Sequence, residues 1–128
     1  MGEKPTKAMR ILLVDDDQDV RDTIKLVLKM ERHNVIEAND GREALDYLKK
    51  DGFDLVITDY VMPEMSGDVL AAEMKRNSPS TPLIMITANA DLLPNQLPGV
   101  DRVLSKPFEV SELVQMIREF SERSSVKE

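Results

Sequence analysis

The sequence predicts an α/β fold built on a parallel sheet, and three features of its pattern indicate this. Five short runs of β-branched and aliphatic residues recur along the 128 residues. Amphipathic stretches with helical spacing separate most of these runs. Three of the runs are almost wholly apolar, which is typical of parallel strands that are covered by helices on both faces. Strands that alternate with helices in this way form one parallel sheet.

The first half of the chain shows this alternation twice. Strands are expected at 11–14 and 34–37, and an apolar stripe at helical spacing follows each of them. The stripes are Val20, Ile24, Val27 and Leu28 in one helix, and Ala44, Leu45 and Leu48 in the next. Asp17 is expected to cap the first helix. Asp40 is expected to cap the second, with Glu43 closing a capping box three residues later.

The second half continues the pattern with less regularity. Strands are expected at 55–58, 83–86 and 102–104, and a helix entered through Ser66 and Gly67 follows the first of them. The apolar positions of the remaining helices are Leu70, Ala71 and Met74 in one, and Leu113, Met116, Ile117 and Phe120 in the last.

The segment 89–99 should hold a further helix if the alternation is strict. It contains Pro94 and Pro98, and a proline inside a helix removes a backbone donor and clashes with the preceding turn. The fourth helix is therefore expected to be short or irregular.

Composition limits the kind of protein. One domain is expected at 10–120, with a flexible lead-in at 1–9 and a polar tail, or the start of a linker, at 121–128. The net charge of −7 argues against direct binding to nucleic acid or to an anionic membrane. The chain has no cysteine, which excludes thiolate metal sites and fits a cytoplasmic protein. Its one histidine, His33, is expected on the surface.

Polar residues end four of the expected strands. They are Asp15, Asp16 and Asp17 after the first, Asp59 at the third, Thr87 at the fourth and Lys106 at the fifth. The carboxyl ends of parallel strands share one edge of the sheet, so these side chains are expected to meet. Clustered carboxylates repel one another, and Mg²⁺ with a phosphoryl group relieves that repulsion. Lys106 and Thr87 suit phosphoryl oxygens, and one carboxylate remains as a nucleophile that can form an aspartyl phosphate.

The same residues carry a resemblance that extends from about residue 10 to 120. Four motifs occur in order, each at the end of an expected strand: Ile11 to Asp17, Asp54 to Gly67, Ile86-Thr87-Ala88 and Lys106-Pro107-Phe108. Together they resemble the receiver domain of two-component response regulators, of the chemotaxis-regulator kind. The resemblance implies a doubly wound domain with the strand order 2-1-3-4-5.

The resemblance also implies a role for each site residue. Asp59 would accept a phosphoryl group from a sensor histidine kinase or a histidine phosphotransfer protein, and Thr87 and Lys106 would contact that group. The Mg²⁺ ligands would be Asp15, Asp16, Asp59 and the backbone carbonyl of Val61. The protein would not be an enzyme beyond catalysing its own phosphorylation and slow dephosphorylation. Phosphorylation would switch a surface for an output partner or domain that the sequence does not name. The Lys106–Pro107 bond is expected to be cis.

Two positions depart from the family pattern. Val103 stands three residues before Lys106, where an aromatic ring is usual. The stretch between Thr87 and Lys106 is shorter than usual. We therefore expect phosphoacceptor chemistry to be retained, while signalling uses a face other than the one built from the fourth helix, fifth strand and last helix.

Two other functions remain open from the residues alone. A receiver-like module could bind partners without being phosphorylated. A phosphohydrolase of the haloacid dehalogenase type would use Asp15 as nucleophile and Asp17 as general acid. Asp19 occupies the place where those enzymes usually carry threonine or valine, and Asp59 would have no task.

Overall fold

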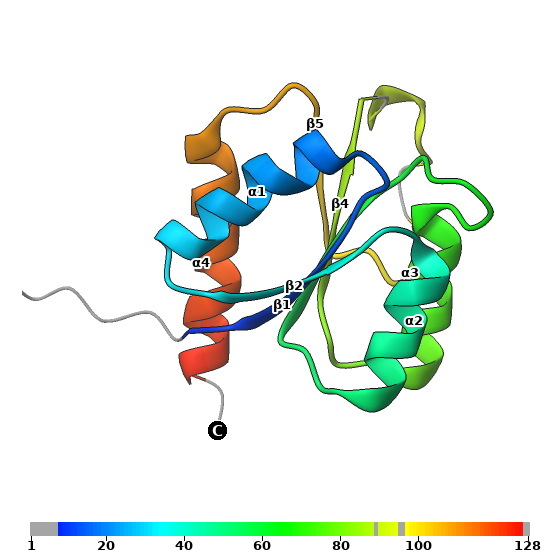
Figure 1. The fold of residues 1–128 in the computed structure, drawn as a ribbon, viewed down its shortest axis with the longest axis horizontal. Coiled ribbons are helices and arrows are strands. Elements are labelled where there is room, and N and C mark those ends of the chain that lie inside the picture. Colours follow the sequence, from blue (N-terminus) through cyan, green and yellow to red (C-terminus); the bar gives the residue numbers. More distant parts are fainter. Residues whose placement is uncertain (1–7, 89, 95–96, 127–128) are drawn as a thin grey trace, which may run out of the picture.

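The computed structural model describes residues 8–88, 90–94 and 97–126 (Figure 1). Strands and helices alternate along these ranges as the sequence predicts. The strands are β1 (Arg10–Val14), β2 (Asn34–Ala38), β3 (Leu55–Asp59), β4 (Leu83–Thr87) and β5 (Arg102–Ser105). The helices are α1 (Gln18–Met30), α2 (Gly41–Lys50), α3 (Gly67–Asn77), the 3-10 turn η1 (Ala90–Leu92) and α4 (Val110–Val126). None of the described helices is long and apolar enough to cross a membrane.

All neighbouring strands are parallel, and their order is β2-β1-β3-β4-β5, which confirms the expected topology. The chain leaves β1 toward β2 on one side and later returns to β3 on the other. The strand order therefore reverses between β1 and β3, which is where open α/β sheets bind their ligands. The register pairs Val14 with Thr58, so the residues that follow β1 lie beside Asp59 at the end of β3.

Each face of the sheet packs against two helices (Figure 1). Alternate residues of a strand point to opposite faces, so Ile11 and Leu13 pack with α1 and α4, while Leu12 and Val14 pack with α2 and α3. Both cores are mainly aliphatic, with Phe120 in one and Phe53 in the other, and both are continuous across β1, β3 and β4. The result is an apolar frame in which Asp59 and Thr87 stand at the ends of their strands.

The helix caps confirm the local predictions, with one change. Asp17 caps α1 by accepting from the backbone amides of Asp19 and Val20. Asp40 caps α2 by accepting from the amide of Glu43 at 2.9 Å. The Glu43 carboxylate returns to the amide of Asn39 at 2.7 Å, one residue before the position that a standard capping box uses.

Residues just outside the expected domain range of 10–120 are buried at both of its ends. Met9, which we assigned to a flexible lead-in, is fully buried, and its amide donates to His33 Nδ1 at 2.9 Å. His33 is 5% exposed, so the prediction of a surface histidine is wrong. At the other end α4 continues to Val126 and buries Ser121, because its first half anchors it to the sheet. Residues 1–7 and 127–128 lie outside the described ranges.

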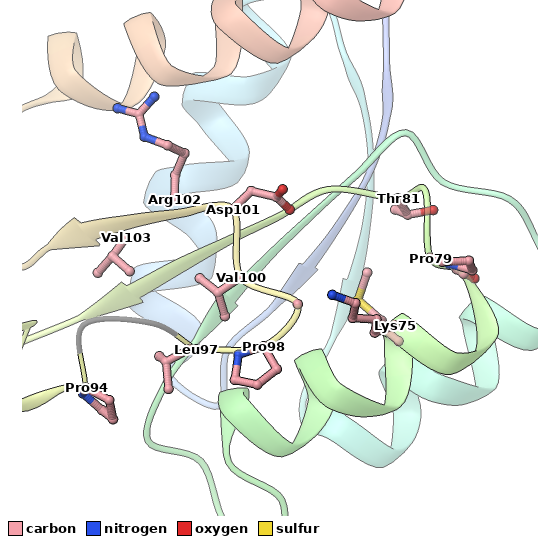
Figure 2. A pocket seen from close by; sticks show the side chains of 13 residues that line it. Lys75, Pro79, Thr81, Pro94, Leu97, Pro98, Val100, Asp101, Arg102 and Val103 are labelled. Atoms are coloured by element: carbon pink, nitrogen blue, oxygen red, sulfur yellow. The ribbon is translucent and has the colours of Figure 1, made fainter.

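The connection between β4 and β5 has the short helix that the two prolines predict. Its described residues form η1 and a loop that packs on α3. Gly99 has a φ of +82° and lies so close to α3 that an added Cβ would be 2.6 Å from the Ala71 carbonyl oxygen. A hollow of about 670 Å³ lies between this loop and the end of α3 (Figure 2). Lys75, Thr81 and Asp101 are among the residues that line it, at the edge of the sheet opposite Lys106.

Candidate functional site

Three carboxylates meet at the point where the strand order reverses. Asp15 and Asp16 follow β1, and Asp59 ends β3. Carboxylate oxygens of all three lie within 4.8 Å of one another. Asp15 is 2% exposed, the Asp59 side chain is 12% exposed and Asp16 is exposed. The cluster therefore has two shielded acids and one that faces solvent.

Lys106 brings a positive charge to this cluster from the end of β5. Its Nζ lies 3.3 Å from Asp59 Oδ1 and 3.9 Å from Asp15 Oδ2. The Lys106 side chain is 25% exposed, so it reaches the acids from the solvent-facing rim. A single ammonium leaves three carboxylates under-neutralised.

The ionisation of the two shielded acids reflects mainly their burial. Burial raises the pKa of Asp15 to about 6, and the nearby Asp59 charge adds to the rise, while the hydrogen bond from the Asp17 amide opposes it. Burial also raises the pKa of Asp59, and the charge of Lys106 offsets part of the rise. A hard divalent cation with oxygen ligands would relieve the repulsion, so the donor set fits Mg²⁺.

The remaining predicted site residues lie on the same edge. Thr87 is the last residue of β4 and is buried, and its carbonyl accepts from the Lys106 amide at 2.8 Å. The Lys106–Pro107 bond is cis, as expected. Val61 lies two residues beyond Asp59 with an exposed side chain. The role of its backbone carbonyl as a metal ligand stays a prediction.

The loop between β3 and α3 is held close to Asp59 by backbone contacts. The amide of Gly67 donates to the Tyr60 carbonyl at 2.8 Å. An added Cβ on Gly67 would lie 2.3 Å from the Asp59 carbonyl oxygen, so only glycine fits there. The hydroxyl of Thr58 donates to that same carbonyl at 2.9 Å. These contacts fix the backbone on both sides of the Asp59 carboxylate.

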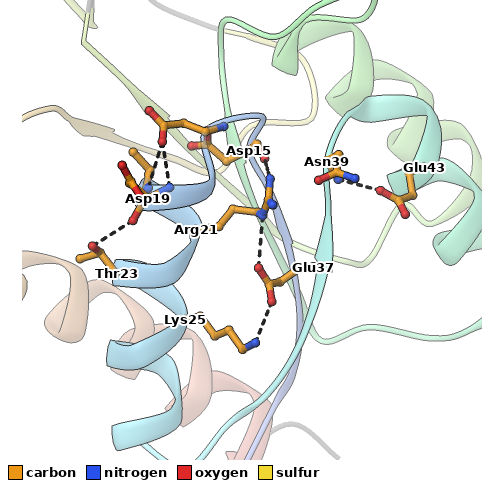
Figure 3. A network of polar contacts seen from close by, with 10 residues as sticks. Asp15, Asp19, Arg21, Thr23, Lys25, Glu37, Asn39 and Glu43 are labelled. Carbon is orange, nitrogen blue, oxygen red and sulfur yellow. Dashed lines mark hydrogen bonds and ion pairs between the residues drawn. The ribbon is translucent and has the colours of Figure 1, made fainter.

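Arg21 is a site residue that the sequence analysis missed. Its guanidinium donates to the Asp15 carbonyl at 2.6 Å and to Glu37 at 3.2 Å (Figure 3). The signal was present, because Arg21 lies three residues before Ile24 and seven before Leu28, on the buried stripe of α1. A charged residue at such a position needs a buried partner.

Asp17 lies next to the cluster in sequence but serves the helix. Its carboxylate caps α1 and is not among the three acids that converge. It is thus placed to stabilise the helix start rather than to act as the general acid that a dehalogenase-type hydrolase requires. Val103 lies in β5 opposite Met85 and is 40% exposed. This position therefore carries a partly exposed valine in place of the aromatic ring that the resemblance led us to look for.

The sequence matches the family model of the response regulator receiver domain over residues 11–118. It is 44% identical over 119 residues to the transcriptional regulatory protein CpxR of Escherichia coli (strain K12), covering 90% of this chain and 50% of that protein. It is 33% identical over 121 residues to the response regulator MprA of Mycolicibacterium vanbaalenii, covering 91% and 52% respectively. The chain thus spans about half the length of these curated relatives.

Solved structures show the same fold. A CheY-like response regulator receiver domain protein from Methanospirillum hungatei superposes with a TM-score of 0.88 at 28% identity, covering 95% of this chain and all of that one. The response regulator TrrA from Thermotoga maritima, solved in complex with Mg²⁺ and BeF, superposes with a TM-score of 0.81 at 30% identity, covering 87% and 97%.

Proposed function

This chain belongs to the response regulator receiver domain family, and on that premise we propose that Asp59 accepts a phosphoryl group in an Mg²⁺-dependent reaction. The observation that supports this most directly is the convergence of Asp15, Asp16 and Asp59 around one point with Lys106 beside them. Such a set supplies a nucleophile, a metal site and a counter-charge together, which is what phosphoryl transfer requires.

In the proposed reaction a carboxylate oxygen of Asp59 attacks the phosphorus of a phosphohistidine. The new O–P bond forms as the P–N bond breaks, and the released imidazole takes a proton. Asp59 is suited to this role because its side chain is shielded but not sealed, at 12% exposure, and its backbone is held by Gly67 and Thr58. A fixed nucleophile in line with the leaving group lowers the barrier without further chemistry.

Asp15, Asp16 and Asp59 would hold the Mg²⁺, with the Val61 carbonyl as a further ligand. When bound, the ion neutralises charge that develops on the phosphoryl oxygens. Lys106 would pair with one of those oxygens, since its Nζ already lies 3.3 Å from Asp59 Oδ1. Thr87 would donate to another, because it ends the strand beside β3.

The partners follow from the reaction class. The phosphoryl donor would be a sensor histidine kinase or a histidine phosphotransfer protein, in the cytoplasm. The output would be a partner protein or a further domain that reads the phosphorylated state. The domain would catalyse its own phosphorylation and a slow dephosphorylation, and no other reaction.

Intact-mass spectrometry after incubation with acetyl phosphate tests this proposal. We expect one phosphoryl adduct that requires Mg²⁺ and is absent in Asp59→Asn. Asp46→Asn, an exposed acid of α2, is the matched control and should gain the adduct normally. Absence of any adduct would favour a module that binds without phosphorylation. Steady hydrolysis of acetyl phosphate that survives Asp59→Asn would point to a hydrolase.

A further inference from the structure

We propose that Arg21 is a positioning residue that orients the peptide between Asp15 and Asp16 and thereby sets the affinity of the site for Mg²⁺. The inference rests on the proposed function, because it concerns how this chain prepares the metal site. It gives a role to the buried guanidinium of Arg21, which does not take part in the proposed phosphoryl transfer.

The Arg21 guanidinium bridges two elements that flank the site (Figure 3). Its Nη1 donates to the Asp15 carbonyl at 2.6 Å, and its Nε donates to Glu37 Oε1 on β2 at 3.2 Å. The side chain is only 9% exposed. A guanidinium so buried is costly to leave unpaired, so both bonds are strongly favoured.

Glu37 keeps the guanidinium in place from the far side. Its other carboxylate oxygen accepts from Lys25 Nζ at 2.8 Å. The hydrogen bond from Lys25 lowers the pKa of Glu37, and the bond from Arg21 lowers it further. Glu37 therefore stays charged at neutral pH and restrains the direction in which Arg21 reaches.

The carbonyl that Arg21 holds belongs to the peptide that joins the first two acids of the cluster. Other bonds restrain Asp15 itself: its amide donates to the Ala38 carbonyl at 3.3 Å, and its Oδ1 accepts from the Asp17 amide at 2.9 Å. The second of these bonds closes a turn that contains the peptide leading to Asp16. The bond from Arg21 acts directly on the carbonyl oxygen of that peptide, so it adds to the turn in setting the direction in which the exposed Asp16 carboxylate leaves the backbone.

Loss of that bond should weaken metal binding without removing a ligand. A peptide with less restraint would have to be ordered further when Mg²⁺ binds, and groups that orient metal ligands typically change affinity 10-fold to 100-fold when removed. Lys25 offers a matched control, because it donates to the other oxygen of the same Glu37, whereas the bond to the Asp15 carbonyl comes from Arg21.

Calorimetric titration with MgCl₂, without a phosphoryl donor, tests the inference on the full chain. We expect the dissociation constant to rise about 10-fold in Arg21→Met and to stay within about twofold of the wild type in Lys25→Met. The ¹⁵N amide shift of Asp16, whose N–H belongs to the same peptide, should move in Mg²⁺-free Arg21→Met and not in Lys25→Met. Urea unfolding of each variant accounts for any general loss of stability.

Two results would separate the inference from the proposed function. Equal Mg²⁺ affinity and an unchanged Asp16 amide in Arg21→Met would overturn the inference and leave the proposed function intact. A wild-type protein that fails to bind Mg²⁺ would overturn both. If Arg21→Met does not fold, Arg21→Lys decides: it keeps the charge but lacks the guanidinium fork, and we expect it to bind Mg²⁺ more weakly than Lys25→Met.

Discussion

The two halves of the carboxyl edge of the sheet are built differently. At β1 and β3, side chains and backbone hold the acids through several independent bonds, including those of Arg21 to Asp15 and of Gly67 to Tyr60. At β4 and β5, the described connection is one 3-10 turn and a loop, and Val103 lies 40% exposed on the outer strand. Among the described residues, several bonds restrain the first half, and the second half has a short connection and a partly exposed outer strand.

This difference indicates that phosphoryl chemistry and its readout depend on separate parts of the molecule. The chemistry needs fixed charges at one point, and β1 and β3 supply most of them. The readout needs a surface that changes when the site is phosphorylated. Because the described residues near η1 form one short 3-10 turn and a loop, we propose that the signal leaves by another face, near the loops that follow β1 and β3.

The largest expected effect comes from the acids of the first half. We expect Asp15→Asn to raise the free energy of unfolding at pH 8, without Mg²⁺, by about 3 kcal/mol. The folded protein raises the pKa of Asp15 to about 6 from 3.8, so an ionised Asp15 opposes folding above pH 6. Urea unfolding of the variant, with Asp46→Asn as control, measures the gain.

The same linkage predicts how that gain changes with pH. Between pH 6 and pH 4 the folded wild type binds a proton at Asp15 that the unfolded chain does not, so the wild type becomes more stable relative to Asp15→Asn. The difference between the two proteins should be complete above pH 7 and vanish near pH 3, below the ordinary pKa of Asp15. A difference that stays constant over this range would show that burial of the Asp15 charge does not destabilise the site.

An intermediate effect is expected in the second half. Gly99→Ala should lower the free energy of unfolding by about 2 kcal/mol, because Gly99 combines a positive φ with a contact to Ala71 that leaves no room for a Cβ. Phosphorylation of Asp59 by acetyl phosphate should proceed at the wild-type rate. Gly52→Ala is the control, since nothing lies within 4 Å of an added Cβ there. If Gly99→Ala is fully folded and yet is phosphorylated more slowly than the wild type, the β4–β5 half of the edge would be shown to affect the chemistry at β1 and β3.

The smallest effect is expected at Val103. Val103→Tyr restores a ring at the place where the family usually has one, yet the described residues that contact β5 from this connection form the short turn η1. We expect the phosphorylation rate to change less than twofold and the stability by about 0.5 kcal/mol or less, as for most exposed positions. The rate is measured by mixing the protein with acetyl phosphate, quenching samples at set times and determining the phosphorylated fraction by mass spectrometry. A large acceleration would show that the ring position still governs the site.

What the sequence predicted well was local. Strand ends, the caps Asp17 and Asp40, and the short helix near Pro94 and Pro98 depend on residues close together in the chain. The convergence of the acids followed from the general rule that the carboxyl ends of parallel strands share an edge.

What the sequence did not predict depends on contacts between distant residues. His33 is buried because the Met9 amide, 24 residues away, donates to its ring. Arg21 is buried because the Asp15 carbonyl and Glu37 accept its donors. α4 extends through Ser121 because its apolar face rests on the sheet and α1. The sequence around a polar residue does not show whether a distant residue will supply the hydrogen-bond partner that allows it to be buried.

A map of amide chemical shifts with and without Mg²⁺ and beryllofluoride, a mimic of the phosphoryl group, tests the separation of chemistry from readout most directly. The account predicts the largest shifts at the residues that follow β1 and β3 and at Thr87 and Lys106, with distant changes that avoid 97–103 and the exposed face of α4. Strong distant changes concentrated along β5, the loop before it and α4 would contradict it.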